Sequence, residues 1–245
     1  MKGMSVLLLL ISVLFWGFAA EGKLTRPANG LKLIFKPVFR GGSLCLHTQA
    51  YIDFHGDTLY VDALRFYISS IMLKSKDGGN YKKIPGYHLI DAEDSTTESI
   101  RITGVDEGTY TAIRFQIGVD SLTNVSGALD GDLDPAKGMY WAWNTGYIHA
   151  KLEGHAKVCP TLHQEFEFHI GGYLPPYQTI RSVELDLGTL KIRANGESVL
   201  TLHCDVSKWL AETDLAKTNS VLIPGRQAMK LADNYKEMFS VCTIY

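Results

Sequence analysis

The chain has 245 residues, of which 46% are hydrophobic and 20% are charged, a composition typical of a globular protein. This composition excludes collagen-like, low-complexity and wholly disordered chains. The 24 basic and 26 acidic side chains give a formal net charge of −2, and no run of Lys and Arg stands out, so nucleic acid is not an expected partner.

Residues 1–20 have the pattern of a secretory signal peptide. Lys2 gives a short positive start, the stretch from Ser5 to Phe18 is almost entirely apolar, and Ala19 and Ala20 are small residues suited to cleavage. This apolar stretch is too short for a membrane span, and no later segment is long enough. We therefore expect cleavage near Ala19 or Ala20 and a mature protein that is periplasmic or secreted.

Short β-type runs separated by turn signals dominate the chain after residue 30. Turn residues cluster at 76–80 and at 106–108. Such close spacing of turns indicates an antiparallel sandwich or barrel. We predict an all-β fold, an antiparallel β-sandwich, with residues 21–245 in one domain. The runs are 31–35, 44–46, 58–61, 64–68, 71–73 and 110–118.

The segment 138–172 is the densest in aromatic and histidine side chains. Within it, 147–153 and 165–169 each alternate apolar with polar or charged side chains, as half-buried strands do. A loop around Cys159 joins them. The pattern predicts a β-hairpin with histidines and glutamates on one face.

A register that sets Lys151 against Glu167 as an ion pair would place His149 opposite His169. Directly opposite Cβ atoms lie roughly 5 Å apart, close enough for two imidazoles to share an ion. A slip of two residues would remove this pairing. Structural or surface roles are the alternative for these histidines. The same register sets His155 against His163.

Two indoles precede the hairpin. Trp141 and Trp143 are spaced to share one face of a strand that 144–146 interrupts. Such a pair usually belongs to a core or to an aromatic patch. An exposed patch could bind a partner protein or a ligand without any metal, and this function remains an alternative.

A helical pattern appears only near the C-terminus. Residues 227–239 place Ala228, Leu231, Tyr235 and Met238 on one stripe. We predict a short amphipathic helix that covers an edge of the sheet, and a single helical turn at 207–210.

The four cysteines fall in the part expected to be exported. An even number outside the cytosol favours two disulfides, and three pairings are possible. No CxxC spacing is present, which argues against a thiolate zinc site. The cysteines are Cys45, Cys159, Cys204 and Cys242.

The motifs of common enzymes are missing from the sequence. It has no Gly-x-Ser-x-Gly nucleophile motif and no glycine-rich phosphate loop. The acidic run 130–134 does not continue as a calcium loop, because Pro135 and Trp141 stand where that loop needs Gly and Glu. We expect no enzymatic activity.

Several long segments resemble the MbnP-like family, in matching order. These are exported copper-binding proteins associated with methanobactin uptake and with the copper-repressible surface proteins of methanotrophs. Several long motifs in order are more specific than any single motif. The segments are VDALRFYISSIMLKSKDG (61–78), FQIGVDSLTN (115–124), LDPAKGMYWAWNTGYIHAKLEG (133–154), FHIGGY (168–173) and IPGRQAMKLADNYKEMF (223–239).

The resemblance implies a β-sandwich that binds one copper ion through His side chains and a Trp oxidised to kynurenine. It also implies a partner that performs the oxidation, a dihaem enzyme of the MauG or cytochrome-c-peroxidase type. Trp141 and Trp143 are then the candidates for oxidation. The function implied is copper acquisition or handling. The candidate copper ligands, best-matched first, are His169, His149, and then His55 or His47.

Overall fold

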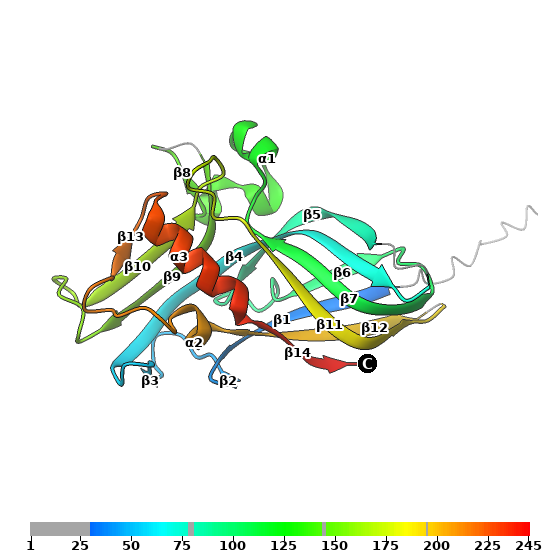
Figure 1. The fold of residues 1–245 in the computed structure, drawn as a ribbon, viewed down its shortest axis with the longest axis horizontal. Coiled ribbons are helices and arrows are strands. Elements are labelled where there is room, and N and C mark those ends of the chain that lie inside the picture. The colour runs from blue at the N-terminus through cyan, green and yellow to red at the C-terminus, as the bar shows by residue number, and fades with distance from the viewer. Residues whose placement is uncertain (1–29, 78–80, 144–145, 195) are drawn as a thin grey trace, which may run out of the picture.

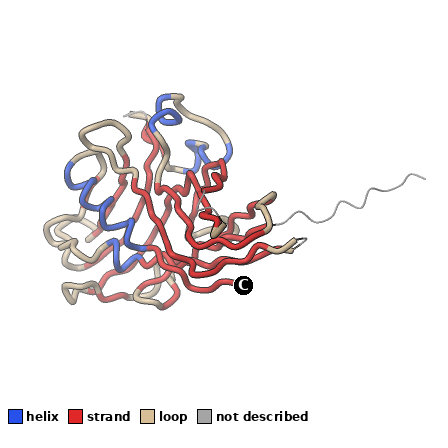
Figure 2. The backbone as a smooth tube through the Cα atoms, turned by 45° about the vertical axis from the view of Figure 1, so that its right-hand side comes forward, coloured by secondary structure: helices blue, strands red, loops and turns tan. Residues whose placement is uncertain are grey.

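The computed structural model describes residues 30–77, 81–143, 146–194 and 196–245. The predicted signal peptide, residues 1–20, lies outside the described residues. The described chain forms two β-sheets that lie against each other as a sandwich, with short helices at the margins (Figures 1 and 2). The predicted all-β sandwich is therefore confirmed.

The smaller sheet has five strands. Their bounds are β1 (Gly30–Phe39), β2 (Gly42–Ser43), β6 (Ser99–Thr103), β12 (Glu197–Asp205) and β14 (Phe239–Ile244). The order is β14–β12–β1–β2, and β6 also pairs with β1. The pair β1–β12 is parallel, and a long connection through the larger sheet and β6 joins the two strands.

The larger sheet has nine strands. Six follow in the order β11–β7–β4–β9–β10–β13, while β3 and β5 also pair with β4, and β8 pairs with β9. The pair β10–β13 is parallel, so both sheets are mixed although most pairs are antiparallel as predicted. The bounds are β3 (Tyr51–Ile52), β4 (Thr58–Ser75), β5 (Tyr81–Asp91), β7 (Gly108–Ile117), β8 (Tyr140–Trp141), β9 (Gly146–Ala156), β10 (Glu165–Gly171), β11 (Arg181–Ile192) and β13 (Ser220–Val221).

The predicted C-terminal helix is present as α3 (Arg226–Tyr235), and its stripe of Ala228, Leu231, Ala232 and Tyr235 is buried. It contacts β10 and is followed by a 3-10 turn and then by β14, so it ends earlier than predicted (Figure 1). No helix among the described residues is long and apolar enough to cross a membrane. The other helices are α1 (Ser121–Val125), α2 (Val206–Trp209), and the 3-10 turns Gly131–Leu133, Pro135–Lys137 and Lys236–Met238.

Phenylalanines join the two sheets at the centre of the core. The Phe35 ring of β1 meets the Phe66 ring of β4 edge to face at 6.3 Å and the Phe115 ring of β7 at 5.7 Å. All three side chains are fully buried. Burying one such ring contributes about 1.5–3 kcal/mol, so the alternating apolar faces of the strands account for the sandwich.

Strand β4 organises the larger sheet. The sequence predicts three short runs here, but the structure has one strand of 18 residues whose pairing is interrupted by bulges at Asp62 and near Ser70. The bulges shift the alternation of faces, so one strand looks like three in the sequence. The first half of β4 pairs with β9 and the second half with β7. The predicted run 44–46 forms no strand.

Candidate metal site

The hairpin predicted from the sequence exists as β9 and β10, but its register differs by two residues. Lys151 faces His169 and Glu153 faces Glu167. The expected pairing of His149 with His169 is therefore wrong. The loop fixes the register, because the backbone N–H of Ala156 donates to the carbonyl of Gln164 at 2.8 Å. The predicted His155–His163 pair is also replaced, by His155 opposite Glu165.

The observed register brings together one imidazole and two carboxylates on the outer face of the larger sheet. Glu153, Glu167 and His169 each offer a donor atom, and these atoms all lie within 4.8 Å of one another. The side chains are partly buried, His169 being 18% and Glu153 31% exposed. Such a group can hold a cation.

Glu153 is held ionised by its neighbours. The Nε2 of His169 lies 2.6 Å from Glu153 Oε1, and the ammonium of Lys151 lies 3.5 Å from the same oxygen. The hydrogen bond from His169 is the largest cause that lowers the pKa of Glu153 to about 2, and the charge of Lys151 adds to it. A metal ion that entered here would replace the proton between His169 and Glu153.

Sequence reasoning missed the two glutamates of this group. The sequence pattern places both glutamates on the histidine face of the hairpin, but it singles out only histidines as ligands. The signal is that the polar face of one strand carries Glu153 and that of the next carries Glu165, Glu167 and His169. The signal becomes usable only when the register is known.

His149 lies in a different environment from His169. Its side chain is fully buried, at an irregularity where the β9–β10 pairing shifts, and its Nδ1 lies 3.0 Å from the hydroxyl of Thr179. A Cβ on Gly118 would lie 2.7 Å from its Cγ, so the ring fills the space beside the end of β7. Burial lowers the pKa of His149 to about 3, so the ring is neutral at pH 7.

The two remaining histidine candidates are exposed. His55 lies in the turn between β3 and β4, where its backbone N–H donates to Asp53 Oδ1 at 2.8 Å. His47 precedes β3, and its Nδ1 lies 3.3 Å from Asp62 Oδ1. The structure therefore does not bring His169, His149 and His55 together in one group.

The two indoles differ in their surroundings, contrary to the prediction that they share a face of one strand. Strand β8 ends at Trp141, which is 6% exposed, whereas Trp143 lies beyond the strand and is 66% exposed. Their ring centroids are 5.9 Å apart. The indole of Trp141 covers Gly171, because a Cβ on that residue would lie 2.6 Å from Trp141 Cζ3.

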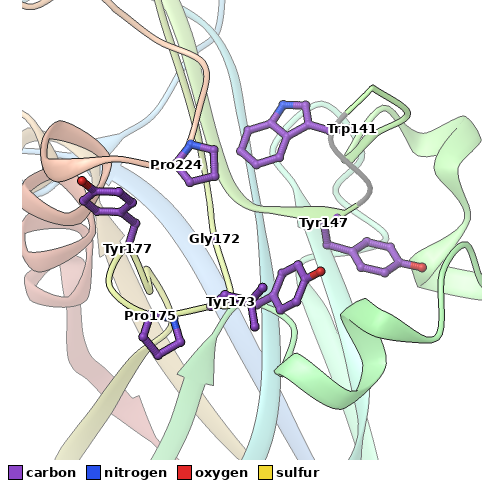
Figure 3. A pocket seen from close by; sticks show the side chains of 9 residues that line it. Trp141, Tyr147, Gly172, Tyr173, Pro175, Tyr177 and Pro224 are labelled. Carbon is purple, nitrogen blue, oxygen red and sulfur yellow. The ribbon is translucent and has the colours of Figure 1, made fainter.

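Trp141 also borders a pocket of about 230 Å³. Trp141 and Tyr147 lie on one side of it, and Tyr177 and Pro224 lie on the other, with Tyr173 between them (Figure 3). The lining is mainly aromatic and proline side chains. One edge of an otherwise buried indole is therefore reachable from this pocket.

The four cysteines are free thiols, so the predicted disulfides are not present in the structure. They lie on separate elements: Cys204 points into the core from β12, Cys242 is exposed on β14, and Cys45 and Cys159 lie in loops. Burial raises the pKa of the Cys204 thiol well above its usual value, which makes it unreactive. An even count indicates a pairing only if the fold brings the thiols together.

Comparison with known proteins agrees with the resemblance seen in the sequence. Among solved structures, MbnP from Methylosinus trichosporium matches with a TM-score of 0.59 at 14% sequence identity, over 87% of this chain and 98% of that chain. At this identity the likeness shows the fold alone. No curated protein sequence matches the chain. The family model of MbnP matches residues 28–224, most of the chain, and the chain therefore belongs to the MbnP family.

Proposed function

We propose that this protein is an exported copper-binding protein, without enzymatic activity, that serves copper acquisition or handling. The observation that carries the proposal is the group of Glu153, Glu167 and His169, with donor atoms within 4.8 Å of one another. Family membership supports copper as the ion. The apolar residues 5–18 support export.

The register itself favours a cation at this place. Glu153 and Glu167 lie directly opposite each other, and like charges in this position destabilise a sheet. His169 and Lys151 offset the charge of Glu153. Among the described residues no ion pair is found for Glu167, so a bound cation would supply the missing positive charge.

The donor set suits copper in its divalent state. Imidazole nitrogen and carboxylate oxygen are donors that Cu²⁺ accepts, and Cu²⁺ binds such sites more tightly than the other divalent first-row ions. Bound copper would be stored or passed on, and no reaction is assigned to it. In this scheme His169 and the two glutamates bind the ion, while Lys151 limits the net charge of the site.

Trp141 is the residue we propose for conversion to kynurenine, by a dihaem partner of the MauG or cytochrome-c-peroxidase type. The conversion breaks the indole C2–C3 bond, adds two oxygen atoms and, after hydrolysis, releases C2 as formate. Two equivalents of peroxide, reduced to water at the partner, would supply the oxygen and accept the electrons. The indole of Trp141 covers Gly171, which lies two residues after His169 on the same strand, β10.

Copper titration of the metal-free, tag-free protein tests the binding proposal. Loss of an outer-shell partner already weakens metal affinity by roughly 10–100-fold, so His169→Ala should weaken copper binding by at least about 100-fold. Glu167→Gln should weaken it less, because Glu153 remains. His163→Ala, which removes an exposed loop histidine, is the matched control. Full copper affinity in His169→Ala would refute the ligand assignment.

Peptide mass spectrometry of protein made together with its natural neighbours tests the modification. We expect kynurenine at Trp141 and unmodified Trp143. Unmodified Trp141 in such a preparation would refute this part of the proposal. The same titration on His149→Gln tests the prediction that His149 is a second ligand, for which the buried position in the structure offers no support.

A second candidate function is the binding of a partner or ligand at the pocket beside Trp141, without metal. The aromatic and proline lining of the pocket and the exposed Trp143 favour it. Copper titration separates the two functions. A protein that retains no copper after reconstitution and desalting, but whose Trp fluorescence responds to a ligand, would support this second function.

A further inference from the structure

A second group of histidine and carboxylate side chains lies on the same outer face of the larger sheet. His155 Nδ1 is 2.8 Å from Asp62 Oδ2, and His47 Nδ1 is 3.3 Å from Asp62 Oδ1. None of these three residues belongs to the Glu153, Glu167 and His169 group. We call them the Asp62 cluster.

Three separate elements hold the Asp62 cluster. Asp62 is the extra residue at a bulge, where the pairing of β4 with β9 shifts between Val61 and Ala63. Bulges re-aim side chains and are common beside functional sites. On β9, the His155 ring stacks on Tyr60 with centroids 4.8 Å apart and planes inclined by 10°.

The third element is the loop that carries His47. The backbone N–H of His47 donates to the carbonyl of Val61 at 2.8 Å, which ties the loop to the strand next to Asp62. His47 has a φ of 63°, in the left-handed region that residues other than Gly rarely adopt. The backbone therefore presents this imidazole toward Asp62 although its side chain is 56% exposed.

Asp62 lies close enough to each imidazole to share a small metal ion with it, but the two imidazoles do not yet lie within 4.8 Å of each other and of Asp62 as one group. With Zn–N and Zn–O bonds of about 2.0–2.1 Å in a tetrahedron, neighbouring donor atoms lie roughly 3.3 Å apart. The two contacts of Asp62 are 2.8 and 3.3 Å. The imidazoles approach different oxygens of Asp62, so one ion requires them to turn toward each other, and exposures of 56% and 41% leave them room to do so.

His47 also has the outer-shell partner that metal-binding histidines usually have. Its second nitrogen, Nε2, lies 3.5 Å from Glu93 Oε1, and Glu93 Oε2 is bound by Arg65 at 2.6 Å. A carboxylate on the far nitrogen fixes the ring orientation and strengthens the imidazole as a ligand. Arg65 in turn fixes that carboxylate.

We propose that His47, Asp62 and His155 form a second metal site, which takes a divalent transition-metal ion such as Zn²⁺ or Cu²⁺. Two imidazoles and one carboxylate are a donor set that both ions accept, and a fourth position stays open to water. The site lies next to the first group, since Glu153 and His155 are two residues apart on one face of β9, roughly 6.6 Å along the strand. The inference does not depend on copper being bound at His169.

Zinc titration of the metal-free, tag-free full chain tests the proposal. Calorimetry measures the affinity for Zn²⁺, and native mass spectrometry measures the number of ions bound. We expect wild type to bind one more Zn²⁺ than the double variant His47→Ala/His155→Ala, with at least about tenfold loss of affinity in Asp62→Asn. His163→Ala is the control for loss of an exposed histidine. Far-ultraviolet circular dichroism should be unchanged, because both histidines are exposed.

The variants also separate this site from the first one. His169→Ala should retain the Zn²⁺ that the double variant loses. Equal Zn²⁺ stoichiometry and affinity in wild type and in His47→Ala/His155→Ala would overturn the proposal, as would loss of all Zn²⁺ binding in His169→Ala alone. Failure of copper to bind at His169 would leave the Zn²⁺ difference in place.

Discussion

The close contact between Gly171 and Trp141 gives a sharp test of how the candidate site is built. A Cβ on Gly171 would lie 2.6 Å from Trp141 Cζ3 and 2.7 Å from the carbonyl oxygen of Tyr147, whereas ordinary contacts are 3.4–4 Å. The φ of Gly171 is not in the left-handed region, so Gly171→Ala introduces a steric change without backbone strain. Both neighbours would have to move by roughly 0.7 Å or more, the shortfall from ordinary van der Waals contact.

Overpacking of this kind costs about 1–3 kcal/mol. We expect the upper part of this range for Gly171→Ala, because the Tyr147 carbonyl belongs to β9 and cannot move without disturbing the sheet. A loss of about 2–3 kcal/mol would lower Tm by roughly 4–12 °C in a chain of this size. Urea unfolding followed by circular dichroism measures the free energy, and Trp fluorescence reports whether the indole moves toward solvent.

A double-mutant cycle identifies the group that clashes. In a Trp141→Phe background the smaller ring leaves room, so Gly171→Ala should cost about 1 kcal/mol less than in wild type. Gly42→Ala is the control, because its Cβ would meet nothing closer than the Phe39 carbonyl oxygen at 3.6 Å. An equal cost in both backgrounds would show that the indole does not cover Gly171, and no cost at all would refute the packing described here.

Three further predictions concern the interior. His149 has a pKa of about 3 in the folded protein against an ordinary 6.5. Between pH 6.5 and pH 3 the unfolded chain therefore binds a proton at His149 that the folded protein does not bind. Stability should fall by up to about 1.4 kcal/mol per pH unit as pH drops through that window, and an unchanged slope in His149→Gln would contradict this assignment. A thiol reagent should modify Cys45 and Cys242 in the native protein, and Cys159 and Cys204 only after unfolding; no reactive thiol in either state would restore the disulfide prediction. Asn124→Ala should lower the free energy of unfolding by about 1–3 kcal/mol, because Asn124 Oδ1 accepts the backbone N–H of Tyr147 at 2.8 Å in the interior; urea unfolding equal to wild type would refute this.

Periodicity predicts which faces of the strands are buried but not how the strands join. The alternation in 147–153 and 165–169 correctly predicts the β9–β10 hairpin. The sequence pattern predicts three short strands where the structure has the single strand β4, because a bulge reverses the alternation of faces. Composition gives no reliable sign of a bulge. The parallel pair β1–β12 joins residues far apart in the chain, beyond the reach of any local pattern.

Two of the site predictions depend on long-range geometry in the same way. The even number of cysteines predicts disulfides, but the fold places the thiols on separate elements. The spacing of Trp141 and Trp143 predicts a shared face, but β8 ends between them, so one indole is buried and the other exposed. In each case the sequence identifies the residue types but not their spatial partners.

The register of the β9–β10 hairpin shows why local electrostatics selected the wrong partner. Registers that differ by two residues keep every side chain on its face, so burial does not distinguish them. The ion pair Lys151–Glu167 favours the predicted register, yet the protein sets Glu153 against Glu167 and Lys151 against His169. Hairpin closure at Ala156 and Gln164 and the bulge near Gly171 decide the pairing. His169 and Lys151 offset the charge of Glu153, and a cation at the proposed site would offset that of Glu167 as well.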